Sequence, residues 1–370
     1  MATCALPGIR STTAPVRAGG VSPRSCPSKI KTARRQIVNV AVAGLGWWGK
    51  QIIQSLATSE KLNVVVAVDP VVTEEGTAFA RDAGVELVAD LAEALGRSDI
   101  DAVILATPHA VHEQQALSAF EAGKHVFCEK PLAMTAAGAQ RMVNAAARSG
   151  KVLGVGHERR FEPAIAELMR MVRAGALGRL LHLEANVSHD LFRKLDPSNW
   201  RLDAKHAPAG MLTAVGIHVT DIFVALAGPA RGVQARSESL VMPAPVRDFT
   251  TATLAFGSGA RATISFLSVT PFHGRIAVFG DQGWVEIVSE GNVDQGLPTR
   301  LIHCSGTSLP RTERVFEATD AVLVNFEAWA DAVAGTRSYP FTAAELVGNI
   351  QLFEAIVQSC ERGGETVLLH

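Results

Sequence analysis

The sequence predicts an α/β protein in two parts: a doubly wound parallel-sheet domain, followed by an α/β domain with a large, mainly antiparallel open sheet. Three observations support this prediction. A buried strand pattern leads into a glycine-rich turn near residue 44, apolar runs and helical patterns alternate as far as residue 157, and long β-rich runs follow from about residue 178. The 370 residues are enough for two domains of ordinary size.

The first strand runs into a glycine turn and a helix. The string VNVAVAGLGWWGKQII places Gly44, Gly46 and Gly49 at G-x-G-x-x-G spacing directly after an apolar run. Gly44 permits the tight turn, Gly46 lets the backbone approach a pyrophosphate, and Gly49 lets the helix pack close to the strand. The helix dipole and free N–H groups then face the phosphates, and Trp47 and Trp48 are expected at their rim. This is the dinucleotide-binding pattern of a Rossmann domain.

The second strand supplies a carboxylate for the cofactor. The run LNVVVAVDP ends at Asp69, about 20 residues beyond Gly49, where an acidic side chain meets the adenosine ribose hydroxyls. Pro70 follows and offers no positive charge for a 2′-phosphate. NAD is therefore the predicted cofactor, and NADP is less favoured.

Strands and helices continue to alternate up to residue 157. Apolar, β-branched runs predict strands, and helical patterns that start at Thr or Asp predict helices. The expected strands are 85–89, 101–107, 124–128 and 151–156, and the expected helices are 73–84, 90–97, 109–123 and 135–150. This spacing indicates parallel βαβ units with right-handed crossovers. The Rossmann domain is therefore predicted to span residues 37–157.

Residues 158–370 are predicted to form a second domain for substrate binding and oligomerisation. Neighbouring β-rich runs are separated by G-S-G and D-Q-G turns, which favour antiparallel pairing. The expected strand regions are 179–189, 231–242, 248–269 and 274–290. A helical pattern at about 342–361 predicts a C-terminal helix that packs back on the first domain.

The first 36 residues differ from the rest of the chain. They hold seven Lys or Arg and no acidic residue, with many Ser, Thr, Pro and Gly. This composition is typical of an organellar transit peptide, and it also fits an upstream extension without a targeting role. We expect residues 1–36 to be disordered in either case. The predicted location is cytoplasmic, or organellar if the segment is a transit peptide.

Composition indicates a small molecule as the partner. The formal net charge is -1, so no field of the whole chain favours nucleic acid or an anionic membrane. No apolar run approaches the roughly 18 residues needed to span a bilayer. The five cysteines form no C-x-x-C pair and no zinc-like spacing with histidine, so no metal site is expected.

A second group of candidate residues lies where predicted strands end. The string HVFCEKPL places Glu129 and Lys130 at the carboxyl end of a strand, where ligands bind in such domains. Thr107 and Pro108 end the preceding strand, and His112 follows one turn later. These residues are expected to contact the cofactor on its nicotinamide side.

Six motifs stand in the order in which a known family carries them. They are AGLGWWG, VDP, ATPHAVH, AGKHVFCEKPLA, GHERRFEP and GMLTAVGIHVTD. Through them, residues 37 to about 368 resemble the Gfo/Idh/MocA family of NAD(P)-dependent oxidoreductases, which includes glucose-fructose oxidoreductase and inositol dehydrogenases. The resemblance implies a nucleotide domain followed by an α/β domain whose open sheet joins subunits into homodimers or homotetramers.

The resemblance also implies catalytic roles for two residues. Lys130 matches the motif lysine that contacts substrate and cofactor, and His218 in GIHVTD matches the histidine that acts as acid or base. Histidine suits this role because its ordinary pKa of about 6.5 lets it exchange a proton near neutral pH. Family members often carry Asp four residues before this histidine. This chain has Ala214 there, preceded by Thr213, which is a candidate substrate contact.

Further side chains are predicted to face the substrate. His157 and Arg160 follow the last strand of the first domain, in GHERRFEP. His189, Trp200 and Arg201 lie in a polar and aromatic segment before the helix of GIHVTD, where a hydroxylated or acidic substrate could be held.

The predicted function is hydride transfer between nicotinamide and a secondary alcohol or ketone of a sugar, an inositol or a related cyclic polyol. One alternative is a dehydrogenase of a cyclic dihydrodiol or a carboxylated ring, because Arg160 and Arg201 could pair with a carboxylate. Another is an NAD-binding regulator with weakened catalysis. Ala214 favours the regulator, whereas Lys130 and His218 favour an enzyme.

Overall fold

The computed structural model describes residues 37–292, 295–306 and 310–369. The predictions made for residues 1–36 lie outside this part of the chain. Among the described residues, no helix is long and apolar enough to cross a membrane.

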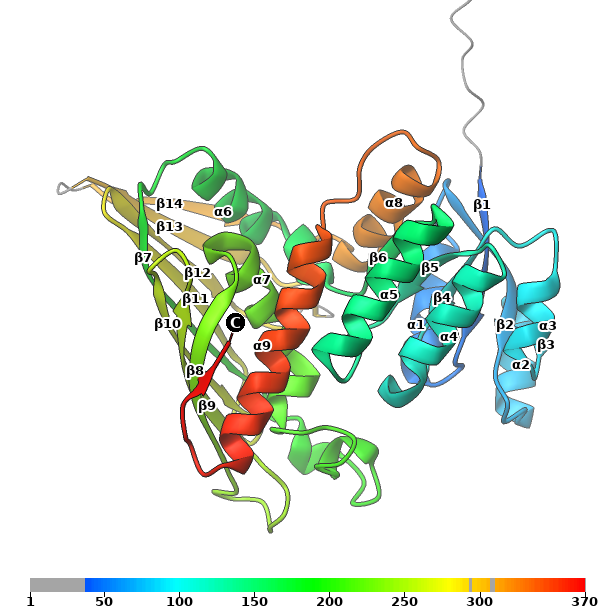
Figure 1. Ribbon diagram of the computed structural model, residues 1–370, viewed down its shortest axis with the longest axis horizontal. Helices are drawn as coiled ribbons and strands as arrows, with labels where there is room; N and C mark the ends of the chain where they lie inside the picture. Colours follow the sequence, from blue (N-terminus) through cyan, green and yellow to red (C-terminus); the bar gives the residue numbers. More distant parts are fainter. Residues whose placement is uncertain (1–36, 293–294, 307–309, 370) are drawn as a thin grey trace, which may run out of the picture. The chain divides into compact units, whose positions relative to one another are not determined.

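Six parallel strands form the first sheet (Figure 1). Their order is β3-β2-β1-β4-β5-β6, and each neighbouring pair is parallel. The strands are β1 (Val38–Ala43), β2 (Leu62–Val68), β3 (Glu86–Val88), β4 (Ala102–Leu105), β5 (His125–Cys128) and β6 (Leu153–Val155). The chain runs outward from β1 to β3 and then returns to β4, so the strand order reverses beside the glycine turn. This confirms the predicted doubly wound fold.

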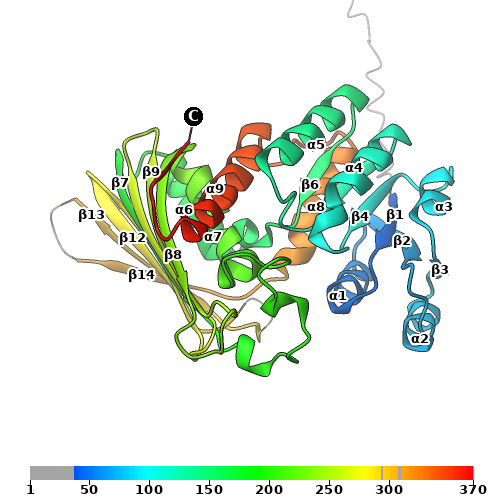
Figure 2. The ribbon, with the colours of Figure 1, turned by 60° about the horizontal axis from the view of Figure 1, so that its bottom comes forward.

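Helices cover both faces of the first sheet (Figure 2). Ala41 of β1 shares a core with Phe120 and Met142 on one face, whereas its neighbour Val42 shares a core with Ile52 on the other. This alternation follows from the two-residue period of a strand. The helices are α1 (Trp47–Leu56), α2 (Glu74–Asp82), α3 (Leu91–Gly96), α4 (His112–Glu121) and α5 (Ala136–Ser149).

A helix from the last third of the chain completes one of these faces. This helix, α8 (Ala321–Val333), contacts α1 and β5. Phe326 and Trp329 are buried, with ring centroids 4.2 Å and 5.5 Å from that of Phe127 in β5. The first sheet therefore draws part of its core from beyond the predicted range 37–157.

Nine strands form the second sheet, in the order β14-β13-β12-β11-β7-β10-β9-β8-β15. Its described pairs are antiparallel except β7 with β10, as expected for a mainly antiparallel open sheet. The strands are β7 (Leu180–Ser188), β8 (Ala230–Glu238), β9 (Phe249–Phe256), β10 (Arg261–Leu267), β11 (His273–Gly280), β12 (Gly283–Ser289), β13 (Thr299–Ser305), β14 (Thr312–Phe316) and β15 (Val367–Leu368).

One face of the second sheet packs against helices (Figure 1). They are α6 (Pro163–Arg173), α7 (Ile217–Ala227) and α9 (Ala343–Glu361). The last of these is the predicted C-terminal helix, which a capping box at Thr342 begins. It also contacts α5, where the backbone N–H of Ala136 donates to Glu354 Oε2 over 2.9 Å. The helix α9 therefore packs against the second sheet through β8 and against a helix of the first domain, α5.

Two element boundaries differ from the sequence prediction by three residues or more. The strand expected over 231–242 ends at Glu238, because three backbone N–H groups that follow it donate to the Asp248 carboxylate. The helix expected from residue 109 begins at His112, after a separate 3₁₀ turn, η1 (His109–Val111). In both places local hydrogen bonds override the apolar pattern.

Candidate active site

The turn after β1 leaves open backbone at the N-terminus of α1. Gly44 has a φ of +97°, and a Cβ there would lie 2.6 Å from Ala106 O, so a larger residue does not fit. A Cβ at Gly49 would lie 1.8 Å from Gly44 O. Beside Gly46, in contrast, a Cβ would meet nothing within 4 Å, and no side chain caps the helix. These residues fit a dinucleotide, because an anionic pyrophosphate can approach the helix N-terminus here.

Asp69 is held at the mouth of this turn. Its Oδ2 accepts a hydrogen bond from Leu45 N (2.8 Å), and its Oδ1 accepts one from Val71 N (2.9 Å). Each carboxylate oxygen keeps a lone pair for a ribose hydroxyl. Nearby, the Trp48 indole N–H is buried close to the Glu129 carboxylate, yet it has no partner of ordinary hydrogen-bond geometry among the described residues. Trp48 thus links the start of α1 to Glu129 at the end of β5.

The residues predicted on the nicotinamide side follow β4 and β5 and are called the rim below. Two of them hold the ends of these strands together. The His112 ring is buried, with Nδ1 2.9 Å from Pro131 O and Nε2 2.9 Å from Thr107 O. Burial lowers the pKa of His112, so the ring is neutral and donates to only one of these carbonyls. The Thr107 hydroxyl donates to Gln115 Oε1 (2.6 Å). Pro108 follows Thr107 and precedes η1. His112 and Thr107 thus position the loops of the rim.

Lys130 is anchored by the segment before α7. Its Nζ donates to Ala214 O over 2.6 Å. Ala214 lies in a π-helical turn, η5 (Leu212–Gly216), directly before α7. Position 214 therefore meets the lysine through its backbone carbonyl, and two further N–H bonds of the ammonium remain for a ligand.

Two histidines and a glutamate form a chain beside Lys130. His157 Nδ1 lies 3.3 Å from His218 Nδ1 in α7, and His218 Nε2 lies 3.6 Å from Glu158 Oε1. On the other side, Asn349 Nδ2 of α9 lies 3.1 Å from His157 Nε2. Both histidines and Glu158 are buried, and Glu158 opens a 3₁₀ turn, η2 (Glu158–Phe161), just after β6.

Burial and mutual charge shift the pKa values in this cluster. Burial raises the pKa of Glu158 to about 7, with a smaller contribution from the negative charge of Glu129 and opposition from Lys130. Burial also raises the pKa of Glu129. Burial lowers the pKa of Lys130, and burial followed by the charge of Lys130 lowers that of His218 well below its usual range. Such a group of perturbed side chains at strand ends is typical of an active site.

Arg160 has a different position from the one predicted. Its guanidinium binds both carboxylate oxygens of Asp221 at 2.6 Å, contacts Glu345 at 3.2 Å and lies 4.0 Å above the Phe341 ring. Arg160 and Asp221 are both buried. The structure therefore supports a structural clamp between η2, α7 and α9 in place of the predicted substrate contact.

The segment around Trp200 reaches the rim of the first domain. The Arg201 guanidinium lies 4.4 Å above the Trp200 ring, which meets the His109 ring edge-on at 5.0 Å. Burial and then the charges of His112, Lys130 and Arg201 lower the pKa of His109 to about 3. The charge of Arg201 thus lies near Lys130, and contacts of Trp200 and Arg201 with a substrate remain predictions. His109 was missed, although its place in the motif ATPHAVH was the available signal.

Two other predicted substrate residues have structural neighbours. The Thr213 hydroxyl donates to Pro208 O over 2.7 Å. The His189 ring, just after β7, meets the Phe272 ring edge-on at 6.1 Å. Contacts of Thr213 and His189 with a substrate remain predictions.

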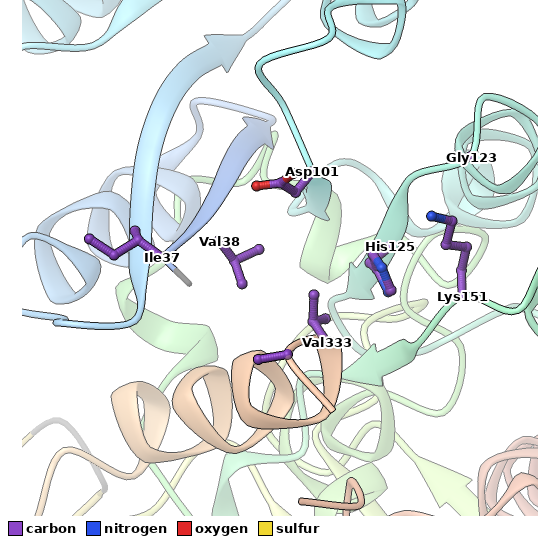
Figure 3. A pocket seen from close by; sticks show the side chains of 8 residues that line it. Ile37, Val38, Asp101, Gly123, His125, Lys151 and Val333 are labelled. Carbon is purple, nitrogen blue, oxygen red and sulfur yellow. The ribbon is translucent and has the colours of Figure 1, made fainter. Parts of the chain in front are cut away.

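A hollow at the opposite edge of the first sheet belongs to a different region. It has a volume of about 170 Å³ and lies at the amino ends of β1, β4 and β5 (Figure 3). In it, Asp101 Oδ2 accepts from Asn39 N (2.9 Å) and His125 Nδ1 accepts from Val152 N (3.0 Å). These polar groups accept hydrogen bonds from the backbone. Because doubly wound sheets bind ligands at the carboxyl ends of their strands, we do not assign the active site to this hollow.

The glycine turn and the rim are typical of a nucleotide-binding Rossmann domain, and a second domain with a nine-stranded sheet follows it. Residues 38–157 match the family model described as an oxidoreductase family with an NAD-binding Rossmann fold. Residues 165–286 match the GFO/IDH/MocA C-terminal domain. The chain belongs to the Gfo/Idh/MocA oxidoreductase family, and its first domain is the NAD-binding domain of that family.

Known proteins of this family share part of the sequence. The chain is 33% identical over 211 residues to 1,5-anhydro-D-fructose reductase of Ensifer adhaerens, covering 56% of this chain and 63% of that protein. It is 38% identical over 144 residues to inositol 2-dehydrogenase 1 of Saccharopolyspora erythraea, covering 38% of this chain and 43% of that protein. The match thus spans less than two thirds of either relative.

The fold is shared with solved structures at lower identity. Levoglucosan dehydrogenase in complex with NADH and levoglucosan matches with a TM-score of 0.80 at 22% identity, covering 90% of this chain and 100% of that chain. At this identity the likeness establishes the fold alone.

Proposed function

We propose that the protein transfers a hydride between a nicotinamide cofactor and a secondary alcohol or ketone of a sugar, an inositol or a related cyclic polyol. The observation that supports this best is the cluster of half-buried Lys130 with buried Glu158 and His218 beside the carboxyl ends of β5 and β6. The names of the two relatives, an anhydrofructose reductase and an inositol 2-dehydrogenase, favour the same class of substrate.

One group of residues would bind the cofactor, and another would orient the substrate and exchange its proton. The glycine turn and Asp69 would hold the pyrophosphate and the adenosine ribose of NAD, which supplies the hydride acceptor when bound. Lys130 has two N–H bonds left to orient the reacting oxygen. The His218 side of the cluster exchanges the hydroxyl proton, and burial there strengthens each electrostatic contact.

The test is a screen of the purified protein with NAD or NADP against aldoses, inositols, other cyclic polyols and cyclic dihydrodiols, following NADH absorbance. Lys130→Ala is measured beside the wild type. Oxidation of a polyol that is lost in Lys130→Ala supports the proposal. Oxidation of dihydrodiols or carboxylated rings alone selects the first alternative, in which Arg201 beside Trp200 holds the acidic group. NADH binding without turnover of any substrate contradicts the proposal and favours a regulator.

We propose that subunits associate as homodimers or homotetramers through the face of the second sheet opposite to α6, α7 and α9. On that face Arg275 of β11 pairs with Glu184 of β7 (2.8 Å) and with Glu286 of β12 (2.5 Å), and all three side chains are about one-third exposed. This ordered polar row offers groups for pairing with a second copy. Light scattering that finds only monomer at every protein concentration contradicts this assembly.

We propose a reducing compartment such as the cytoplasm for the folded protein. The buried thiol of Cys128 forms no disulfide, and reduced cysteines are typical of such compartments. Recovery of the protein in an oxidising compartment on cell fractionation contradicts this location.

A further inference from the structure

The hydrogen positions in the cluster follow from Asn349. Its Nδ2 lies 3.3 Å from the Ile217 carbonyl oxygen, and its Oδ1 accepts a hydrogen bond from the Thr220 hydroxyl over 2.7 Å. A carbonyl oxygen cannot donate, so the atom beside Ile217 O is the amide nitrogen. The same Nδ2 lies 3.1 Å from His157 Nε2, which must therefore be the accepting, unprotonated nitrogen of that ring.

This orientation fixes the hydrogens of both histidines. Burial lowers the pKa of His157 to about 4 and that of His218 well below its usual range, so both rings are neutral near neutral pH. A neutral His157 that accepts at Nε2 carries its hydrogen on Nδ1 and donates it to His218 Nδ1 over 3.3 Å. His218 then carries its own hydrogen on Nε2, 3.6 Å from Glu158 Oε1.

His218 therefore has no lone pair left for a substrate proton. Its Nδ1 accepts from His157 and its Nε2 already bears a hydrogen that faces Glu158. The side chain of Ala214 carries no ionisable group, and the position contributes only its carbonyl oxygen, to Lys130. The carboxylate of Glu158 is the next acceptor in the chain of contacts.

We propose that Glu158 is the proton acceptor of this active site and that His218 is the positioning residue that orients it. This inference rests on the proposed hydride-transfer function and names the group that completes it. In alcohol oxidation, the substrate C–H bond breaks and its electron pair leaves with the hydride for the oxidised nicotinamide. The O–H bond breaks as well, its proton binds a Glu158 oxygen, and the C–O single bond becomes C=O. Reduction of the ketone is the reverse, with neutral Glu158 returning the proton.

Several charged groups around Glu158 affect the pKa of its carboxyl group. The groups that face it are Glu129 and Lys130 at the end of β5, Arg159 beside it on η2, and His218 of α7. The helices α6 and α8 also pack against η2, but their acidic residues pair elsewhere. Those pairs are Glu167 with Arg170 and Arg314, and Glu327 and Asp331 with Lys61.

The sign of the pH dependence follows from the direction of the reaction. Burial raises the pKa of Glu158 to about 7. Oxidation needs the ionised carboxylate, so kcat for oxidation rises with pH through a midpoint near 7. Reduction needs the neutral acid, so kcat for reduction falls as pH rises through the same midpoint.

The test compares Glu158→Gln with Glu162→Gln in the full chain. Glu162 is a matched control, because it is also a shielded carboxylate, 3.3 Å from Arg159 and one turn further along. We expect Glu158→Gln to lower kcat by about 10² or more and to abolish the pH midpoint near 7, with NADH binding within a few-fold of wild type. Glu162→Gln should keep both kcat and the midpoint. Added formate should restore part of the kcat of Glu158→Ala, which a purely structural role does not predict.

Several outcomes would overturn the inference. A Glu158→Gln protein that keeps wild-type kcat, or keeps the midpoint near 7, shows that another group accepts the proton. If Glu158→Gln does not fold, the pH profiles of the wild type still test the inference. The inference is contradicted if kcat does not change around pH 7, or if kcat for oxidation and kcat for reduction change in the same sense. If the wild type turns over no substrate, the proposed function itself fails. If the wild type is active and formate does not rescue Glu158→Ala, only the role of Glu158 fails.

Discussion

At the scale of single residues, Lys130 offers a direct test of substrate orientation. Its ammonium is held by Ala214 O over 2.6 Å, and burial lowers its pKa. Lys130→Met keeps the aliphatic stem and removes the hydrogen-bond donor. We expect kcat to fall by about 10², with NAD affinity within a few-fold of wild type, measured by steady-state kinetics and calorimetry. Lys151→Met, at the opposite edge of the sheet, is the control, and an unchanged kcat in Lys130→Met contradicts the assignment.

We expect Asp69 to determine the choice of cofactor. Its carboxylate is fixed by Leu45 N and Val71 N beside the glycine turn, where we propose that the adenosine ribose binds, so it would repel a 2′-phosphate. We expect calorimetry to show NAD binding at least about tenfold more tightly than NADP, which corresponds to about 1.4 kcal/mol. Asp69→Asn keeps the side-chain shape and removes the charge, so it should reduce the ratio of NAD affinity to NADP affinity. Equal binding of both cofactors by the wild type refutes this prediction.

The residues that sequence could assign are those inside contiguous motifs. The glycine turn, Asp69 and Lys130 each follow directly from a strand-end pattern, because local chain geometry decides where they lie. The contact of Glu158 with His218 and that of Arg160 with Asp221 join separate elements that are distant in sequence. No local pattern carries such pairs, so the sequence directed Arg160 to the substrate and left Glu158 without a role.

At the scale of elements, the Arg160–Asp221 pair holds η2, α7 and α9 together. Both side chains are buried, and removing one charge of such a pair leaves the other unpaired in a poorly solvated place. We expect Asp221→Ala to lower the free energy of unfolding by about 3 to 5 kcal/mol, measured by urea denaturation. The control is the exposed Arg170, which pairs with Glu167: because Glu167 keeps a second partner in Arg314, Arg170→Ala should cost less than about 1 kcal/mol. Equal losses in the two variants contradict the clamp.

Sequence patterns left α6, α8, β13 and β14 without a prediction, and the structure explains why for α8 and β14. In the string AVLVNFEAWADAV of α8, residues outside the buried side, such as Val322, Leu323 and Val324, are also apolar, so the string lacks the amphipathic period of a surface helix. The string TERVF of β14 is mostly exposed along its length at the sheet edge, so it lacks the alternation of a half-buried strand. Among the strongly patterned elements, β1 and α5 were predicted closely, whereas the amphipathic α6 was missed.

At the scale of the whole molecule, the first sheet depends on the last third of the chain. Trp329 of α8 is fully buried against Phe127, and a Cβ at Gly154 would lie 2.7 Å from its ring. Trp329→Ala should lower the free energy of unfolding by about 3 to 5 kcal/mol, measured by urea denaturation. The exposed Trp47→Ala is the control and should cost much less. Similar losses in both variants contradict the role of α8.

The same packing predicts how a fragment behaves. A chain of residues 37–157 contains all six strands of the first sheet but lacks α8, so the apolar face around Phe127 stays open to water. We expect this fragment to unfold without a cooperative transition, whereas residues 37–370 unfold cooperatively in calorimetry. A sharp transition in the fragment shows that the domain is complete without α8.

The position of α8 also bears on how the protein is made. Lys61 and Asp331 bond to each other across 270 positions of sequence. Translation adds about 5 to 20 residues per second, so a nascent chain waits roughly 15 to 50 seconds between the synthesis of these two partners. During that interval the half-covered sheet is a target for chaperones and for neighbouring nascent chains. The strands of the cofactor domain thus leave the ribosome before those of the second sheet, but their packing is completed only after α8 has been made.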